Sequence, residues 1–206
     1  MKISTLLAAA GVFLGCGAAA LGFVYVTSPG DPFAPCRTET MVDHSRIGGS
    51  FELIDETGRA VTDEVVFDRA TLFYLGYTFC PDVCPLDNAR NADAVYRLEE
   101  SGVDVQAVFV SVDPARDTPE VLAFFTDAFH PEMIGLTGTP EQVRSLAEDY
   151  VSTFEIRNEG DDEYYLVDHT TLTFLVLPGH GVVDVIQRDE TAEQVAERAA
   201  CMIRNA

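Results

Sequence analysis

The 206-residue sequence is short of positive charge, and of lysine in particular. It contains 13 lysine and arginine residues against 34 acidic ones, which gives a formal net charge of −21 at pH 7. Lys2 is the only lysine, and tryptophan is absent. Nucleic acid and anionic membrane surfaces attract cationic proteins, so neither is an expected partner of this chain. The acidic surface fits either a cationic protein partner or simply the solubility of an exported domain.

Charge of either sign is missing from residues 3–30. This stretch stays apolar as far as Val26 and exceeds the roughly 20 residues that span a bilayer. Lys2 precedes it and Asp31 follows it, so the positive-inside tendency predicts one N-terminal span in the cytoplasmic membrane. The remaining chain would then lie on the periplasmic, extracytoplasmic side. A cleaved signal peptide is the alternative, because Gly17–Ala20 supplies small residues, but the apolar run beyond them favours an anchor.

Internal repeats, low-complexity tracts and a second globular domain are also missing. We therefore assign residues 1–30 to the anchor, or signal segment, and the start of a tether, and residues 31–206 to one domain. A domain of this size can bury its own core. Export would permit disulfides. Cys36 and Cys201 lie near opposite ends of the domain, where they could bridge the termini or remain two unrelated buried thiols.

The hydrophobic pattern of residues 31–206 alternates between strands and helices, which predicts an α/β protein. The expected strands are 51–54, 59–61, 70–79, 103–112, 134–136, 164–167, 171–177 and 182–186. The expected helices are 86–100, one capped by Thr118, one capped by Thr139 and ending near 150, and 191–203. The Thr118 helix is expected to bury Val121, Leu122, Phe124 and Phe125. This order predicts a thioredoxin-like α/β/α sandwich with an N-terminal hairpin extension and a membrane-anchor helix.

Cys80 and Cys84 stand four positions apart where an apolar strand ends and a helix should start. If the helix includes both, they share one face, because residues i and i+4 are neighbours on a helix. Thiols near a helix N-terminus also ionise more easily. Such a pair can hold one soft metal ion or oxidise to one disulfide. Pro81 and Pro85 place the pair at a strand–helix junction, which favours a functional role over an inert one.

Two sulfurs leave a copper or zinc site incomplete, and imidazole is the expected third ligand. His44 falls in the polar tether and is predicted to be solvated, His130 ends a helix, and His180 occupies a turn. His169 lies between two predicted strands, where it either hydrogen-bonds in the core or faces the sulfurs as a ligand. The cysteine pair favours the ligand role. Asp168 beside it either orients the ring or caps a turn.

Two thiolates and one imidazole make a soft ligand set of low coordination number. This set suits Cu(I), and it can hold Cu(II) when a weak ligand is added. Tetrahedral zinc would require a fourth ligand, for which no residue stands out, so copper is favoured.

Four blocks of the sequence resemble the Sco/SenC family, which comprises copper-handling proteins of cytochrome c oxidase assembly. They are residues 76–85, 110–119, 136–138 and 165–170. The resemblance implies a thioredoxin-like fold, a membrane anchor and copper held by Cys80, Cys84 and His169. It also implies copper delivery to, or thiol reduction at, the binuclear copper site of the oxidase. The implied partners are the copper-accepting oxidase subunit, a thiol reductase and another copper chaperone.

Two other functions remain open. A thiol–disulfide oxidoreductase or thiol peroxidase would use Cys80 and Cys84 as a redox-active catalytic pair, although thioredoxin-like motifs usually separate their cysteines by two residues rather than three. A membrane-tethered binding domain would use a Cys80–Cys84 bridge only to stiffen a loop. The leading hypothesis is a metallochaperone rather than an enzyme.

The 113–119 segment is assigned a structural role near the site, with an ion pair between Arg116 and Asp117 that shapes its loop.

Overall fold

The computed structural model describes residues 31–37, 44–157 and 164–206 of the chain. The predicted anchor falls in residues 1–30 and therefore lies outside the described residues. Among the described residues, no helix combines the length and apolar character that crossing a membrane requires. The chain divides into two compact units, Met1–Pro35 and Cys36–Ala206, and the second contains every described strand.

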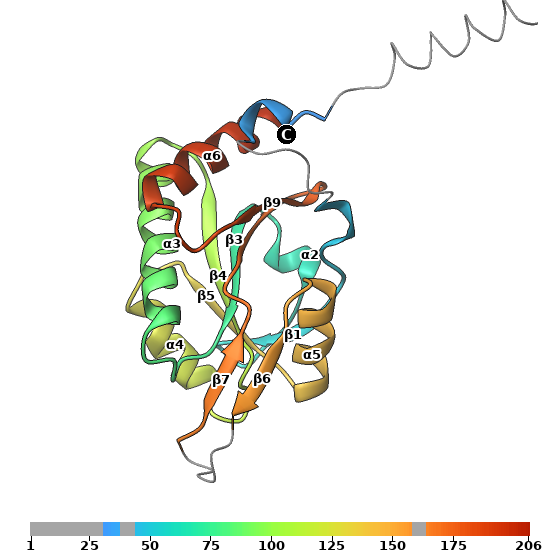
Figure 1. Cartoon of the computed structure of the whole chain (residues 1–206), viewed down its shortest axis with the longest axis vertical. Helices are drawn as coiled ribbons and strands as arrows, with labels where there is room; N and C mark the ends of the chain where they lie inside the picture. The colour runs from blue at the N-terminus through green and yellow to red at the C-terminus, as the bar shows by residue number, and fades with distance from the viewer. Residues whose placement is uncertain (1–30, 38–43, 158–163) are drawn as a thin grey trace, which may run out of the picture. The chain divides into compact units, whose positions relative to one another are not determined.

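A mixed seven-stranded sheet forms the centre of the second unit, in the order β2-β1-β5-β4-β3-β8-β9 (Figure 1). Strands β3, β4 and β5 run parallel to one another, whereas β1 and β8 join them antiparallel. Every residue of β3 and β4 is buried, as expected for strands covered on both faces. The sheet consists of β1 (Glu52–Asp55), β2 (Ala60–Thr62), β3 (Ala70–Gly76), β4 (Val105–Ser111), β5 (Ile134–Thr137), β8 (Thr173–Leu177) and β9 (Gly181–Ile186).

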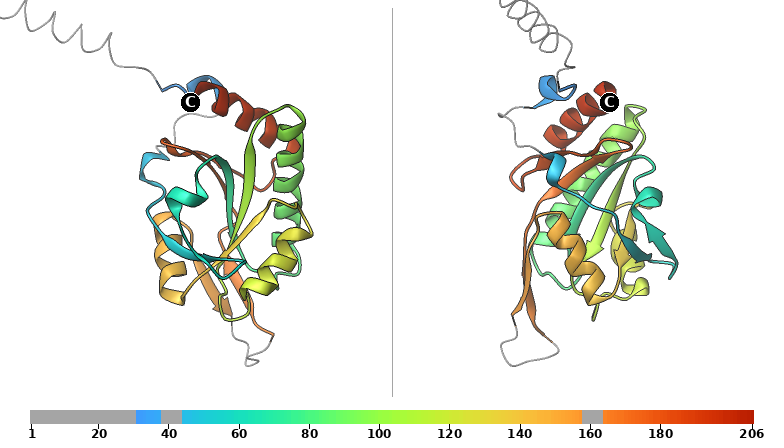
Figure 2. Two further views of the ribbon diagram at one scale, coloured as in Figure 1. Left: turned by 180° about the vertical axis from the view of Figure 1, so that it is seen from behind. Right: turned by 90° about the vertical axis from the view of Figure 1, so that its right-hand side faces the viewer.

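Two further strands form a separate antiparallel pair outside this sheet. They are β6 (Phe154–Arg157) and β7 (Leu166–His169), which extend away from the main sheet in both Figures 1 and 2. Strand β6 was not predicted from the sequence, and β7 was predicted two residues too early. Pairing with β6 carries β7 to His169, so this histidine ends a strand instead of lying between two strands.

Helices cover both sides of the main sheet, with α3 and α4 on one side and α2 and α5 on the other (Figures 1 and 2). Helix α6 packs against α3. The helices are α2 (Asp63–Val66), α3 (Val83–Glu100), α4 (Pro119–Asp127), α5 (Pro140–Asp149) and α6 (Ala192–Asn205), and short 3-10 turns occupy Ala34–Cys36 and His44–Arg46. The predicted mixed α/β architecture and its N-terminal β1–β2 hairpin are confirmed.

The two predicted threonine caps are present. The Thr118 and Thr139 hydroxyls accept hydrogen bonds from the backbone N–H groups of Val121 and Gln142, which would otherwise stay unpaired at the helix starts. The prediction that α4 buries Phe124 is wrong, because this side chain is 84% exposed. Leu122 is fully buried as predicted, and because residues two apart on a helix face different directions, Phe124 points away from the core.

The N-terminal part of the second unit is held to its last helix by a disulfide between Cys36 and Cys201, whose Cα atoms are 5.7 Å apart. The sequence left open whether these two cysteines form a disulfide or remain separate thiols, and the structure contains the disulfide. The prediction that His44 is solvated is wrong, since this residue is buried in a 3-10 turn that packs against β9.

Candidate metal centre

Cys80, Cys84 and His169 come together beyond the C-terminal end of β3. Their ligand atoms all lie within 4.8 Å of one another, and Cys84 Sγ is 3.2 Å from His169 Nε2. Bonds from zinc to sulfur or nitrogen are about 2.0–2.3 Å long, so atoms this close can reach one ion of similar size after small rotations. The other described histidines are not part of this cluster. Folding thus brings the imidazole of His169 to a sulfur pair whose nearer member, Cys84, is 85 residues earlier in the chain.

Cys80 lies in the loop before α3, so the helix includes Cys84 alone and the two cysteines do not share a helix face. The helix also starts earlier than the predicted residue 86. The helix begins at Val83, and its N-cap residue Asp82 makes no side-chain capping hydrogen bond. Instead, the backbone N–H of Cys84 donates to Cys80 Sγ at 3.4 Å. The sulfur of Cys80 therefore pairs with one of the N–H groups that the first helical turn leaves unsatisfied. Pro85 is tolerated in the same turn, because a proline there gives up no helical hydrogen bond.

The two cysteines have opposite acidities. A hydrogen bond from the Cys84 side chain, helped by the backbone N–H groups of Cys84, Asp82 and Val83, lowers the pKa of Cys80 to about 4. The interaction with Cys80 and complete burial raise the pKa of Cys84. At neutral pH the pair is accordingly a Cys80 thiolate beside a protonated Cys84 thiol, an arrangement consistent with the attraction of a helix N-terminus for anions.

The ring orientation of His169 is set by a backbone carbonyl. Nδ1 lies 2.9 Å from the carbonyl oxygen of Thr170, which can only accept, so Nδ1 carries a proton. In the neutral ring Nε2 then has the free lone pair, and this atom faces Cys84 Sγ. Asp168 does not orient the ring, because its carboxylate forms an ion pair with Arg157.

Tyr74 and Asp87 lie on the buried side of Cys84, and neither was predicted as a site residue, because Tyr74 falls within the apolar pattern of a core strand. The Tyr74 hydroxyl is 3.9 Å from Cys84 Sγ and donates to Asp87 Oδ2 at 3.0 Å. Burial raises the pKa of Asp87, and Arg188 lies 3.6 Å from its other carboxylate oxygen. The rings of Tyr74 and Tyr77 meet the His169 ring edge-on, with centroids 6.2 and 5.7 Å away.

Gly76 makes room for the buried sulfur. A Cβ atom at this position would lie 2.9 Å from Cys84 Sγ and 2.9 Å from Cε1 of Tyr74, closer than carbon approaches either atom in real proteins. The strand also ends at Gly76 rather than at Phe79 as predicted, so residues 77–79 are free to turn toward the cysteines. Glycine at this position is therefore part of the site.

The loop after β4 holds the cysteine loop in place. Asp117 is fully buried and accepts hydrogen bonds from the Thr78 backbone N–H at 3.0 Å, the Thr78 hydroxyl at 2.6 Å and the Ser111 hydroxyl at 2.5 Å. Arg116 forms its ion pair with Asp113, so the predicted pairing with Asp117 is wrong. The reason is that Asp117 turns inward to Thr78 and Ser111. The predicted structural role of this segment fits these contacts.

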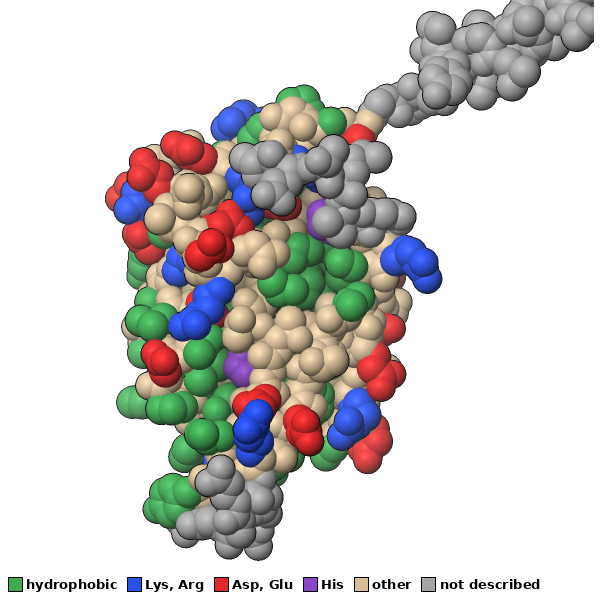
Figure 3. Space-filling view, in the orientation of Figure 1, with side chains coloured by type: hydrophobic (Ala, Val, Ile, Leu, Met, Phe, Trp, Pro, Cys, Tyr) green, Lys and Arg blue, Asp and Glu red, His purple; other side chains and the backbone are tan. Residues whose placement is uncertain are grey.

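Three apolar residues that are close to the cluster residues in the chain have exposed side chains. Phe79, Leu86 and Leu166 are all more than half exposed. Figure 3 shows hydrophobic side chains gathered on the part of this face that α3 and α4 form. His169 is half-buried, Cys80 is 8% exposed and Cys84 is completely buried, so His169 is the most accessible member of the cluster.

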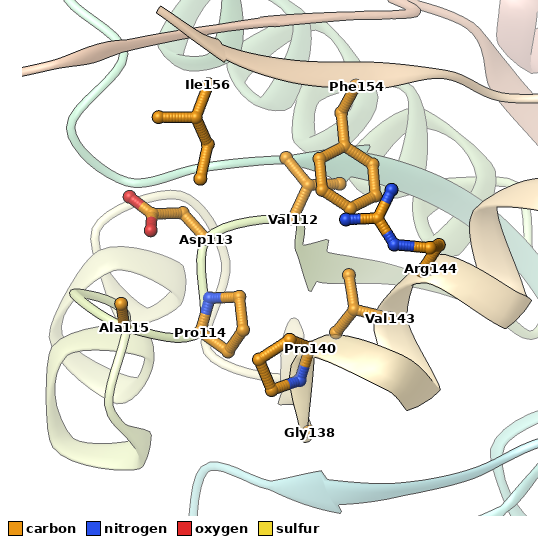
Figure 4. A pocket seen from close by; sticks show the side chains of 10 residues that line it. All are labelled: Val112, Asp113, Pro114, Ala115, Gly138, Pro140, Val143, Arg144, Phe154 and Ile156. Atoms are coloured by element: carbon orange, nitrogen blue, oxygen red, sulfur yellow. The ribbon is translucent and has the colours of Figure 1, made fainter. Parts of the chain in front are cut away.

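A separate hollow of about 270 Å³ lies beside the strand pair (Figure 4). Phe154 and Ile156 point into it from β6, opposite Pro114 and Pro140. None of the three clustered residues lines it. The complete lining is Val112, Asp113, Pro114, Ala115, Gly138, Pro140, Val143, Arg144, Phe154 and Ile156.

Comparison with known proteins finds similar sequences and structures along most of the chain. The SCO1/SenC family model matches residues 39–204. Protein SenC of Rhodobacter capsulatus is 48% identical over 202 residues, covering 98% of this chain and 90% of that protein. Arabidopsis thaliana ScoI with copper bound superposes with a TM-score of 0.74 at 37% identity, covering 78% of this chain and 99% of that one. Yeast Sco1 with copper bound gives 0.69 at 30% identity, covering 77% and 88%.

Proposed function

This chain belongs to the SCO1/SenC family, and from that premise we propose that it binds copper and serves the assembly of cytochrome c oxidase. Cys80, Cys84 and His169 are the proposed ligands. The observation that carries the proposal is the 3.2 Å approach of His169 Nε2 to Cys84 Sγ, which adds a nitrogen donor to a sulfur pair. Related proteins of known structure have been solved with copper bound.

The acidities of the two thiols suit a soft monovalent cation. Cys80 is already a thiolate at neutral pH, so only Cys84 must lose a proton when copper enters. Two thiolates and one neutral imidazole then offer polarizable donors, which favour Cu(I), and Cu(II) needs an additional weak ligand. The thiol pair must be reduced before it binds copper, since disulfide sulfurs are poor ligands. Copper binding is therefore coupled to the redox state of the pair.

Copper is the cargo of the protein in this proposal. Cys84 is completely buried, Cys80 is 8% exposed and His169 is half-buried, so an acceptor would exchange ligands from the side of His169. The exposed apolar residues Phe79 and Leu86 lie close to Cys80 and Cys84 in the chain and offer contact area. The proposed acceptor is the copper-accepting subunit of cytochrome c oxidase. Another copper chaperone would supply the metal, and a thiol reductase would keep the pair reduced.

We further propose that residues 3–30 anchor the protein in the cytoplasmic membrane with its folded domain in the periplasm. The support is the absence of charge from this stretch, with Lys2 before it and Asp31 after it. The SenC relative matches 98% of the chain, so the similarity reaches into this segment. Extraction of membranes with carbonate should leave the full chain in the pellet, whereas a chain released by signal cleavage would appear in the supernatant.

Thiol–disulfide exchange is a second candidate activity, and one observation favours it. A low-pKa thiolate, Cys80, lies beside a buried thiol, Cys84, which is the arrangement of an attacking and a resolving cysteine. His169 has no role in such chemistry. Turnover of a disulfide substrate by the metal-free protein, unchanged in His169→Ala, would establish this activity.

The direct test of the proposed function is titration of Cu(I) into the reduced chain without oxygen, in competition with a Cu(I) chelator. We expect one ion per chain, and no binding after Cys80 and Cys84 are oxidised to a disulfide. Equal binding by the reduced and oxidised forms would show that the sulfurs are not the ligands.

A further inference from the structure

The strand pair that ends in His169 has few buried contacts of its own. Strands β6 and β7 lie outside the main sheet, and Val167 is the single buried residue among their eight. Two side chains of β6, Phe154 and Ile156, face the 270 Å³ hollow instead of close-packed neighbours (Figure 4). An element with so little buried apolar surface is expected to open readily unless other contacts hold it. His169 therefore needs a support that its own strand pair does not supply.

Arg116 supplies contacts to the start of β7. Its Nη1 donates to the carbonyl oxygen of Tyr165 at 2.9 Å, and its guanidinium lies 3.6 Å from the centroid of the Tyr165 ring. The Tyr165 hydroxyl in turn donates to Asp113 Oδ1 at 2.6 Å, and Asp113 is the ion-pair partner of Arg116. Tyr165, four residues before His169, is thus held through its backbone, its ring and its hydroxyl.

The same guanidinium faces the cysteine loop. It lies 4.9 Å from the ring centroid of Phe79, the residue immediately before Cys80, and 5.7 Å from that of Tyr77. The Tyr77 ring meets the His169 ring edge-on at 5.7 Å. Arg116 therefore connects three segments that are distant in sequence: the loop after β4, the cysteine loop and the start of β7.

Hydrogen bonds alone do not explain why the guanidinium of Arg116 is buried between these segments. The Nη2 atom of Arg116 is buried and has no hydrogen-bond partner among the described residues, which is an unfavourable state for a charged group. The aromatic rings around the guanidinium offset this cost through cation–π attraction, and the planar guanidinium can stack on their faces. The observed arrangement thus favours close contact between the segments at the expense of one hydrogen bond.

We infer that Arg116 is a positioning residue of the metal centre: it holds the β6–β7 pair against the cysteine loop and thereby keeps His169 Nε2 near Cys84 Sγ. This inference rests on the proposed function, because the position of His169 matters through its role as a ligand. The contacts of Arg116 among the described residues are with Asp113, Tyr165, Tyr77 and Phe79, so it would act through these residues and not by binding the metal. Its loss should release the imidazole while the sulfur pair stays in place.

The test is a double-mutant cycle on Cu(I) affinity, measured by chelator competition with the reduced full chain. Arg116→Gln should weaken binding about tenfold, the size of effect expected for coupled neighbours. In the His169→Ala background the same substitution should cause no further loss, because there is no imidazole left to position. An equal loss in both backgrounds, or no loss in either, would overturn the inference.

Arg144→Gln is the matched control. Arg144 also lies over an aromatic ring of the strand pair, 5.4 Å from the centroid of Phe154, but it contacts β6 rather than the start of β7. It should leave copper affinity unchanged. If Arg116→Gln fails to fold, Tyr165→Phe serves in its place, since it keeps the ring and removes only the hydroxyl that reaches Asp113. It should give a smaller loss that also disappears in the His169→Ala background.

A measurement on the metal-free protein can test the positioning role of Arg116 independently of the proposed copper binding. Nuclear Overhauser contacts between the rings of His169 and Tyr77 should be present in the metal-free wild type and in Arg144→Gln, and lost in Arg116→Gln. If wild type binds no copper but this pattern holds, the proposed function fails while the positioning role stands. Ring contacts that persist in Arg116→Gln would overturn the positioning role whether or not copper binds.

Discussion

His169 donates from Nδ1 to the carbonyl oxygen of Thr170, the next residue in the chain, across 2.9 Å. This contact determines which ring nitrogen carries the proton, and it directs the unprotonated Nε2 toward Cys84. A backbone carbonyl thus performs the orienting role that carboxylates often fill beside metal-bound histidines. Because no side chain is involved, substitution of Asp168 should not disturb the ring.

Replacing His169 by Ala should weaken Cu(I) binding by at least about tenfold, because one of three ligands is lost while the two sulfurs remain. Chelator competition on the reduced protein measures the change. His180→Ala is the control, since His180 occupies an exposed turn between β8 and β9 and should leave the affinity unchanged. A His169→Ala affinity equal to that of wild type would remove this residue from the site.

The acidity of Cys80 should depend on the side chain at position 84. Ultraviolet absorbance of the thiolate can be followed against pH in chains where Cys16 is replaced by Ser, so that Cys80 is the titrating thiol in each Cys84 variant. Cys84→Ser keeps a hydroxyl donor and should retain a pKa well below the ordinary value of 9.0, whereas Cys84→Ala should raise it.

The direction of the pH effect follows from the sign of the shift. The folded-state pKa of about 4 lies below the ordinary value, so the Cys80 thiolate is present at neutral pH and is lost only as pH falls through about 4. Unfolding in denaturant should restore an ordinary thiol pKa and remove the difference between the two variants. Identical titrations of the two folded variants would show that Cys84 does not stabilise the thiolate.

Gly76→Ala should damage the metal centre, because the added methyl group would lie 2.9 Å from Cys84 Sγ. Overpacking of this kind costs about 1–3 kcal/mol of unfolding free energy, measured by denaturant titration. Gly135→Ala is the matched control, since its methyl group would lie 2.9 Å from Leu122 Cβ. We expect a similar stability loss from both and a loss of copper affinity from Gly76→Ala alone. Equal affinities in the two variants would mean that the sulfur tolerates the methyl group.

The Cys36–Cys201 bridge should stabilise the domain without affecting copper binding. It joins residues separated by 165 positions, and loss of a disulfide from a small exported domain costs about 2–5 kcal/mol. Unfolding of the Cys36→Ser/Cys201→Ser double variant in denaturant measures this cost. Copper affinity of the folded variant should equal that of wild type. A lower affinity would mean that the bridge also shapes the metal centre.

Much of the fold followed from local patterns in the sequence. The fully apolar runs of β3 and β4, the threonine caps and the turn residues around β1–β2 and β8–β9 each depend on neighbours in the chain. The bounds of β3 were wrong because Tyr77 and Phe79 continue the apolar pattern beyond Gly76. Phe124 was placed inside because periodicity does not fix which side of an apolar helix meets the sheet.

In the candidate site, the ligand residues could be predicted from the sequence, but their surroundings could not. Cys80, Cys84 and His169 were predicted as one cluster from the chemistry of their side chains and from a family resemblance, and the structure brings them together. The environment of the cluster was not predicted. The sulfur of Cys80 over the helix start, the room left by Gly76 and the contacts of Arg116 with Tyr165 all depend on packing between distant segments. A single sequence carries no local signal for such contacts.

The central claim is that copper is bound by two sulfurs and the imidazole of His169. Copper-edge X-ray absorption of the copper-loaded, reduced protein tests it most directly. We expect two sulfur scatterers and one imidazole in wild type, and the imidazole signal should disappear in His169→Ala while both sulfurs remain. An imidazole signal that persists in His169→Ala, or its absence from wild type, would contradict the account.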